Sequence, residues 1–124
     1  IEQSKIKIER NDNTGILYNK LKIIGSKLLI STLDLIQTKD FKTKNQDFSK
    51  DYLLAPKLTK SNTRINWNAN SETIHNKIRG LSPYPAAWSK IKKNDKILKI
   101  YKSKLTSKKP SETTIPGKII FDKN

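Results

Sequence analysis

Few residues of this 124-residue chain have the types and spacing that catalysis or metal binding requires. His75 is the sole histidine, and the chain has no cysteine or methionine. One histidine and scattered carboxylates cannot supply the ligand set that holds zinc, and the lack of cysteine excludes thiolate chemistry and disulfides. The four glycines are isolated and form no phosphate-binding loop. We therefore predict no catalytic residue and no metal site in this chain.

His75 is a residue of catalytic type in a position that argues against catalysis. It lies beside Ile74, Ile78 and Leu81, which recur at helical spacing and mark an apolar stripe. A single imidazole next to such a stripe is more often a packing or surface group than a proton carrier. We expect His75 to have a structural role.

Lysine is the residue type whose clustering is informative. The formal charge is +15, and nine lysines against the single Asp95 lie between Lys90 and Lys109. A surface of this kind attracts polyanions, above all nucleic-acid phosphates. An A+T-rich genome would also enrich lysine, an alternative that composition leaves open. Uniform drift, however, does not predict an excess concentrated towards the C-terminus.

The predicted RNA-binding residues are two lysines of an expected linker and seven around an expected strand. They are Lys57, Lys60, Lys90, Lys92, Lys93, Lys96, Lys99, Lys102 and Lys104. Lysine carries a flexible point charge instead of the planar fork of arginine, so we expect weak sequence selectivity. For any single lysine, a solvated side chain without a phosphate partner is the alternative.

Aromatic residues could stack on unpaired bases or pack in a core. Trp67 and Trp88 flank the helix expected at 70–81, whose narrow apolar stripe needs large rings to cover it. We expect both tryptophans in the core. Tyr101 lies on a lysine-flanked strand and is the better stacking candidate.

The elements expected before residue 45 are a short strand and a pair of helices. Residues 6–9 alternate apolar and charged side chains, as a strand with one wet face does. From position 17 onward, leucine and isoleucine recur every three or four residues, which predicts a helix capped by Asp12 or Asn13. Gly25-Ser26 should interrupt this helix and divide it into two.

The rest of the chain predicts a linker, one helix and two short strands. Residues 45–64 have no apolar periodicity, the helix at 70–81 should begin at Asn70 or Ser71, and residues 97–102 and 119–121 are β-rich. Free strand edges bury a core poorly, so we expect a segment of a longer protein. No stretch approaches the roughly 20 apolar residues that span a bilayer, and we expect no membrane interaction.

Several blocks together resemble the methionyl-tRNA formyltransferase family over nearly the whole chain. Residues 12–21 (DNTGILYNKL) are similar to the family pattern DTxGxLYxKL, and residues 46–47 (QD) and 55–58 (APKL) to its linker, with Leu54 where tyrosine is usual. The most specific blocks are 65–67 (INW), 74–81 (IHNKIRGL) and 82–88 (SPYPAAW), which resemble IDW, IHxKIRAL and PWPGAW. Residues 99–102 (KIYK) and 116–120 (PGKII) resemble the opening strands of the C-terminal barrel.

The resemblance implies an α+β chain in three parts. Residues 1–44 would be the end of the α/β Rossmann-like catalytic domain, with a helix pair and a short strand. Residues 45–64 would be the linker. Residues 65–124 would begin an OB-like tRNA-binding barrel with one helix, incomplete here.

The resemblance also implies a cytoplasmic enzyme that transfers a formyl group from 10-formyltetrahydrofolate to the amino group of methionyl initiator tRNA. The family's catalytic Asn, His and Asp precede the position that matches Ile1, so this segment inherits none of them. It would not bind the folate and would hold tRNA as a monomer.

Two alternatives remain at this point. One is a free-standing basic RNA-binding barrel without enzymatic activity. The other is a fragment of an amino-sugar formyltransferase, which shares part of the proline-rich corner. The charge argues against the latter, because an amino-sugar nucleotide needs a compact pocket rather than a long lysine-rich face.

Overall fold

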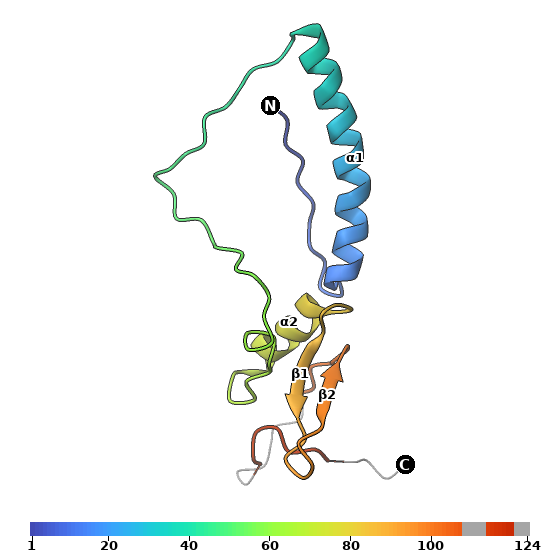
Figure 1. The fold of residues 1–124 in the computed structure, drawn as a ribbon, viewed down its shortest axis with the longest axis vertical. Coiled ribbons are helices and arrows are strands. Elements are labelled where there is room, and N and C mark those ends of the chain that lie inside the picture. The colour runs from blue at the N-terminus through green and yellow to red at the C-terminus, as the bar shows by residue number, and fades with distance from the viewer. Residues whose placement is uncertain (108–113, 121–124) are drawn as a thin grey trace. The chain divides into compact units, whose positions relative to one another are not determined.

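The computed structural model describes residues 1–107 and 114–120 of the chain. In these residues the elements follow the order α1 (Thr14–Thr38), α2 (Ser71–Leu81), β1 (Ala87–Lys90) and β2 (Ile97–Ile100) (Figure 1). This mixture of helices with an antiparallel sheet confirms the predicted α+β class. The chain divides into two compact units, Ile1–Lys57 and Leu58–Asn124. The division falls within the predicted linker, and the bounds of the three predicted parts stay predictions.

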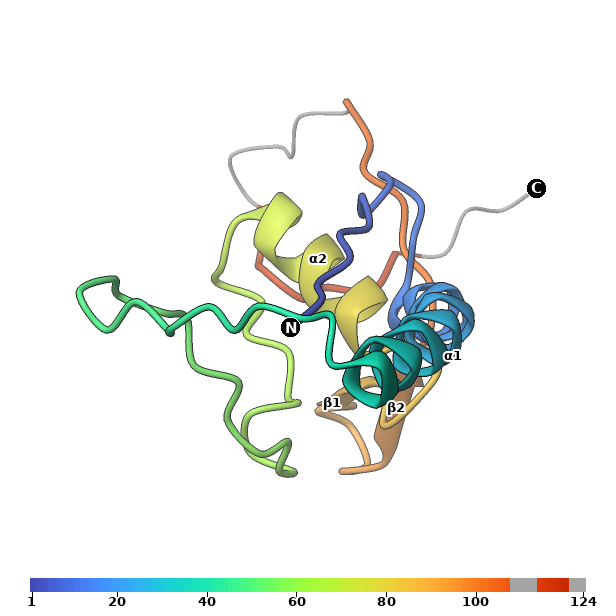
Figure 2. The same cartoon turned by 90° about the horizontal axis from the view of Figure 1, so that it is seen from above.

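The predicted helix pair is wrong, because α1 is a single helix of 25 residues. Figure 2 looks nearly along α1 and shows one unbroken coil. Asn13 caps its start by accepting a hydrogen bond from the Ile16 N–H at 2.9 Å. The Ser26 hydroxyl donates to the Ile23 carbonyl at 2.9 Å, within the helix. A single glycine costs a helix only about 1 kcal/mol relative to alanine, which does not suffice to break one of this length.

The predicted strand at residues 6–9 is also wrong, since these residues belong to no strand. Alternation of side chains favours extended backbone, but a strand exists only where another strand supplies hydrogen bonds. Asp12 fixes the turn into α1 instead. Its buried carboxylate accepts from the Glu9 N–H at 2.8 Å and forms an ion pair with Lys20 at 2.7 Å.

Of the helices described, none combines the length and apolarity needed to cross a membrane.

The core of the Leu58–Asn124 unit lies between α2 and the sheet. Ile65, Ile78, Leu81 and Ala87 are buried together, and partly buried Trp67, Ile74 and Ile100 pack against them. The predicted apolar stripe of α2 is therefore confirmed. The Asn70 side chain caps α2, as predicted, by accepting from the Thr73 N–H at 2.7 Å.

The sheet is an antiparallel pair whose register separates two faces. Ala87 pairs with Ile100, Trp88 with Lys99, Ser89 with Leu98, and Lys90 with Ile97. Opposite residues share a face and neighbours alternate. Fully buried Ala87 marks the face that covers the core, so Trp88 and Lys99 lie on the other face.

A third segment runs along the other edge of β1. The Ile65 N–H donates to the Trp88 carbonyl at 2.8 Å, and the Trp88 N–H donates to the Thr63 carbonyl at 3.3 Å. Arg64 and Trp88 form an isolated parallel bridge. This pairing stabilises β1 on its second edge and orders the end of the predicted linker.

The predicted strands have different outcomes. The strand expected at 97–102 is confirmed as the shorter β2. The strand expected at 119–121 is wrong for Ile119 and Ile120, which lie outside any strand, while Phe121 lies outside the described residues. The OB-like barrel and the Rossmann-like origin of the first residues stay predictions.

A corner after α2 carries the chain into β1. The Ser82-Pro83 and Tyr84-Pro85 peptide bonds are both cis. The Ala86 N–H donates to the Leu81 carbonyl at 2.8 Å, and Ala86 has a φ of 71° with its side chain buried. This bond closes the corner and sets where β1 begins.

We predict that Ile78→Ala lowers the free energy of unfolding of the Leu58–Asn124 unit by about 2 to 4 kcal/mol, because it leaves a cavity in a packed core. Ile78 is only 2% exposed. Urea unfolding followed by tryptophan fluorescence measures this unit, since Trp67 and Trp88 are the two tryptophans of the chain. Ile30→Ala, at a position 62% exposed on α1, is the matched control. Equal effects of the two changes would contradict the core described above.

We also predict that Gly80→Ala raises the free energy of unfolding by about 0.5 to 1 kcal/mol, because alanine restricts the unfolded chain and favours helix. A methyl group at Gly80 would meet no atom within 4 Å. The same urea titration measures the change. A lower midpoint would show that this turn of α2 has no room for a side chain.

Candidate nucleic-acid interface

Trp88 lies on the face of the sheet that is turned away from the core. It follows Ala87, which is fully buried, and alternation along β1 places the indole on the opposite side. The indole N–H donates to the Lys60 carbonyl at 2.8 Å. The expectation of a core position is therefore wrong for Trp88. It is confirmed for Trp67, which packs against the core and donates to the Ser89 hydroxyl at 2.9 Å.

Two cations lie beside the Trp88 ring. The Lys60 ammonium is 5.8 Å from the ring centroid, and the central carbon of the Arg64 guanidinium is 5.6 Å from it. Both distances lie within the roughly 6 Å reach of a cation–π interaction. Lys99 lies on the same face of the sheet, because it pairs directly with Trp88. Two basic side chains therefore lie over the indole, and a third basic residue shares its face of the sheet.

A short turn holds Lys60 and Arg64 in these positions. The Asn62 side chain accepts from the Thr59 N–H at 2.7 Å, and the Thr63 N–H donates to the Thr59 carbonyl at 3.1 Å. The Thr63 hydroxyl donates to the same carbonyl at 2.8 Å. These local bonds order a segment whose composition alone predicts only a linker.

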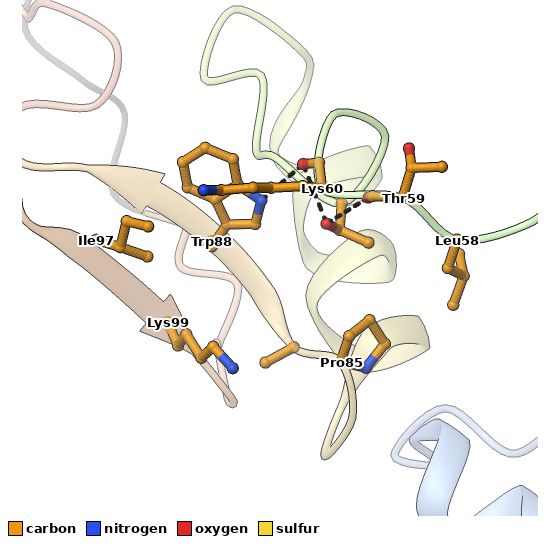
Figure 3. Close-up of a pocket in the computed structure, with 9 residues that line it drawn as sticks. Leu58, Thr59, Lys60, Pro85, Trp88, Ile97 and Lys99 are labelled. Carbon is orange, nitrogen blue, oxygen red and sulfur yellow. Dashed lines mark hydrogen bonds between the residues drawn. The ribbon is translucent and has the colours of Figure 1, made fainter.

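A cavity of about 310 Å³ opens beside Trp88 (Figure 3). Apolar side chains form much of its wall, and lysine amines come from two sides. In Figure 3, Lys60 extends across the Trp88 ring, and Lys99 reaches from β2 in the direction of Pro85. The lining residues are Leu58, Thr59, Lys60, Thr63, Pro85, Ala86, Trp88, Ile97 and Lys99.

Within the described residues, no ion pair neutralises the positive charge at this cavity. Within residues 1–107 and 114–120, no carboxylate lies within 4.0 Å of a basic nitrogen of Lys60, Arg64 or Lys99. Lys90 differs, because it forms an ion pair with Asp95 at 3.5 Å. In the predicted linker, the Ser49 hydroxyl and then Lys50 lower the pKa of the Asp47 carboxyl. An anionic ligand is the natural counter-charge for the cavity.

All nine predicted RNA-binding lysines are exposed. The structure brings Lys60 and Lys99 together at the cavity and does not bring the other seven there. Lys92 and Lys93 occupy the turn between the strands, and Lys96 lies just before β2. The remaining four are Lys57 in the other unit, Lys90 at the end of β1, and Lys102 and Lys104 after β2. Their RNA contacts stay predictions.

Sequence reasoning missed Arg64, Trp88 and Ile97 as members of this site. The pairing of Arg64 with β1 has no sequence signature, because it joins residues more than twenty positions apart. The face on which Trp88 lies did have a sequence signature. Small Ala87 and Ser89 alternate with large Trp88 and Lys90, which is a pattern that predicts opposite faces of a strand.

His75 has the structural environment expected of it. Its Nδ1 lies 2.9 Å from the Ser103 hydroxyl oxygen, which links α2 to the segment after β2. Arg79 donates to the Asn76 side chain at 2.8 Å on the same helix. In the part of the chain that the structure describes, no three histidine or acidic side chains gather as a metal site.

Comparison with known proteins places this unit in a family. A family model described as formyl transferase, C-terminal domain, matches residues 57–124, which include the whole cavity. The chain belongs to the formyl transferase family. The cavity and the nine predicted RNA-binding lysines therefore lie in the part of the chain that matches the C-terminal domain of that family.

Individual relatives extend the match over nearly the whole chain. The chain is 41% identical to a methionyl-tRNA formyltransferase of Flavobacterium johnsoniae over 99% of its own length and 39% of the relative. It is 38% identical to that of Staphylococcus aureus over 97% of its length and 37% of the relative. It is 35% identical to that of Bacteroides fragilis over 98% of its length and 39% of the relative. The predicted resemblance to this group is confirmed, and the chain spans less than two fifths of these relatives.

We predict that Trp88→Phe lowers the free energy of unfolding by about 1 kcal/mol. The phenyl ring keeps the shape of the wall, but the Lys60 carbonyl loses its donor and the cation–π contacts weaken. Urea unfolding followed by far-UV circular dichroism measures the change. Tyr84→Phe, which removes a polar group from a residue 82% exposed, is the control and should leave the midpoint unchanged. No difference between the two variants would mean that the indole N–H does not anchor the 59–65 segment.

Proposed function

We propose that this chain is part of a methionyl-tRNA formyltransferase and that its Leu58–Asn124 unit docks tRNA through the phosphate backbone. The observation that carries the proposal is a group of cations, Lys60, Arg64 and Lys99, on an exposed face of a formyl transferase C-terminal domain. Among the described residues, no carboxylate lies within ion-pairing distance of them. Exposed lysines on the neighbouring turn extend this face. The names of the relatives support tRNA as the polyanion.

The reaction of the parent enzyme would be transfer of a formyl group from 10-formyltetrahydrofolate to the amino group of methionyl initiator tRNA. Such a transfer needs an unprotonated amine, a donor to the developing oxyanion and a group that moves protons. His75 is the only imidazole of the chain, and Ser103 holds it. We therefore assign catalysis and folate binding to other parts of the parent, which we expect to be a cytoplasmic monomer.

Docking by this face would select tRNA weakly by sequence. Lysine ammonium groups contact phosphates as point charges, and Arg64 already lies over the Trp88 ring. Each neutralised phosphate releases counterions, so affinity would fall steeply with salt. Discrimination of the initiator tRNA would then rest on other parts of the parent.

The alternatives are not favoured. A free-standing RNA-binding barrel fits the charge, and an amino-sugar formyltransferase fits the proline-rich corner motif. Relatives that match 97 to 99% of the chain are, however, methionyl-tRNA formyltransferases.

We predict that the chain binds initiator tRNA and an unrelated tRNA with similar affinity and with a log–log salt slope of about −3.5 to −4.5, for about five phosphate contacts. The triple variant Lys92→Ala/Lys93→Ala/Lys99→Ala should reduce the slope by about two to three. Fluorescence titration with labelled tRNA at several salt concentrations measures both quantities.

The control for this experiment is Lys5→Ala/Lys22→Ala/Lys27→Ala, which removes the same charge from exposed positions of the first unit. It should leave the slope nearly unchanged. A slope near zero in the unchanged chain would refute tRNA docking. An equal loss in both triple variants would mean that net charge, and not this face, accounts for binding.

A further inference from the structure

We propose that the cavity beside Trp88 receives one unpaired base of the bound RNA, while Lys60 and Lys99 hold the adjoining phosphates. This inference rests on the proposed function and adds a specific contact to it. The basic face alone explains attraction to any polyanion. It does not explain why the cations gather around an apolar hollow.

The size of the cavity favours a single nucleotide. Its volume of about 310 Å³ lies at the lower end of small-ligand pockets, which span roughly 300 to 1,000 Å³. A duplex cannot enter such a space, because its bases are stacked and paired inside the helix. A base that has left its stack can enter.

The chemistry of the lining matches a base with a phosphate at each side. Pro85, Trp88 and Ile97 offer apolar surface to the face of a base, which every base presents regardless of sequence. Lys60 and Lys99 approach the same hollow from a turn and from a strand, so that two ammonium groups flank one site. A purely apolar ligand would leave these charges uncompensated, and a purely ionic ligand would leave the apolar wall exposed to water.

The polar lining is already engaged in the protein, which predicts little base selectivity. The Thr63 hydroxyl donates to the Thr59 carbonyl at 2.8 Å, and the Thr59 hydroxyl is 2.9 Å from that of Ser61. Readout of a base edge needs free donors and acceptors at fixed positions. The cavity would therefore accept different bases by stacking and burial.

The walls are fixed before binding. The Trp88 indole is held by its hydrogen bond to the Lys60 carbonyl, and Ile97 and Lys99 are held in register by the sheet. A preformed wall reduces the entropy lost when a ligand is ordered.

The test compares ligands that differ only in their bases. A five-nucleotide single-stranded RNA and its abasic counterpart carry the same phosphates and are titrated into the full chain at fixed salt. We expect the base-containing strand to bind at least about fivefold tighter, the lower end of what stacking of one base contributes. We also expect it to quench Trp88 fluorescence, measured in a Trp67→Phe background. A duplex of equal charge and free adenosine monophosphate complete the set.

Two matched variants separate the cavity from the general charge. Ile97→Glu and Leu98→Glu each add one negative charge to β2 at positions 49% and 39% exposed, but only Ile97 lines the cavity. Ile97→Glu should abolish the advantage of the base-containing strand, and Leu98→Glu should preserve it. Lys99→Gln should weaken the base-containing and abasic strands equally. Far-UV circular dichroism verifies that each variant is folded.

The outcomes distinguish this inference from the proposed function. If the normal and abasic strands bind equally and with the same salt slope, the cavity receives no base while phosphate docking stands. If neither strand nor duplex binds, the proposed function fails and this inference fails with it. Free adenosine monophosphate binding as tightly as the strand would overturn the RNA assignment in favour of a mononucleotide site.

Discussion

The backbone pairing of residues 63–65 with β1 is the interaction on which the rest of the Leu58–Asn124 unit depends. Two hydrogen bonds join this segment to Trp88, at 2.8 and 3.3 Å. A two-stranded sheet is marginal in water, and this third segment covers the outer edge of β1. The same pairing sorts the side chains. Thr63 and Ile65 are buried, while Arg64 between them lies over the Trp88 ring. One set of backbone bonds thus positions part of the core and part of the cavity.

The charge at the cavity is a local departure from what folding alone would favour. Lys60 and Arg64 lie over the Trp88 ring and Lys99 lines the cavity beside it, without a carboxylate within ion-pairing distance in the described residues. Like charges brought together oppose the compact state, and such departures from good packing and pairing are expected at functional sites. A bound polyanion would remove this repulsion. This is the physical link between the arrangement of the face and its proposed use.

The corner between α2 and β1 shows how the scaffold fixes one wall of the cavity. Ala86 adopts a φ of 71°, a region that costs an L-residue about 1 to 2 kcal/mol. Its N–H bond to the Leu81 carbonyl and the burial of its methyl group offset that cost. The corner therefore ends α2, starts β1 and holds Pro85 against the cavity. The match of the formyl transferase C-terminal domain includes this entire arrangement.

The sequence by itself determined the features that depend on local spacing and composition. The stripe of α2, its Asn70 cap, the position of β2 and the family resemblance all follow from residues close together in the chain. It failed where distant segments decide the outcome. Residues 6–9 had the alternation of a strand but no partner strand among the described residues, and Gly25 did not interrupt a helix of 25 residues. The candidate site was also predicted only in part. The basic character was visible in the lysines, but only tertiary structure brought Lys60 and Arg64 to Trp88 and Lys99, because pairing across more than twenty residues leaves no periodic signal in the chain.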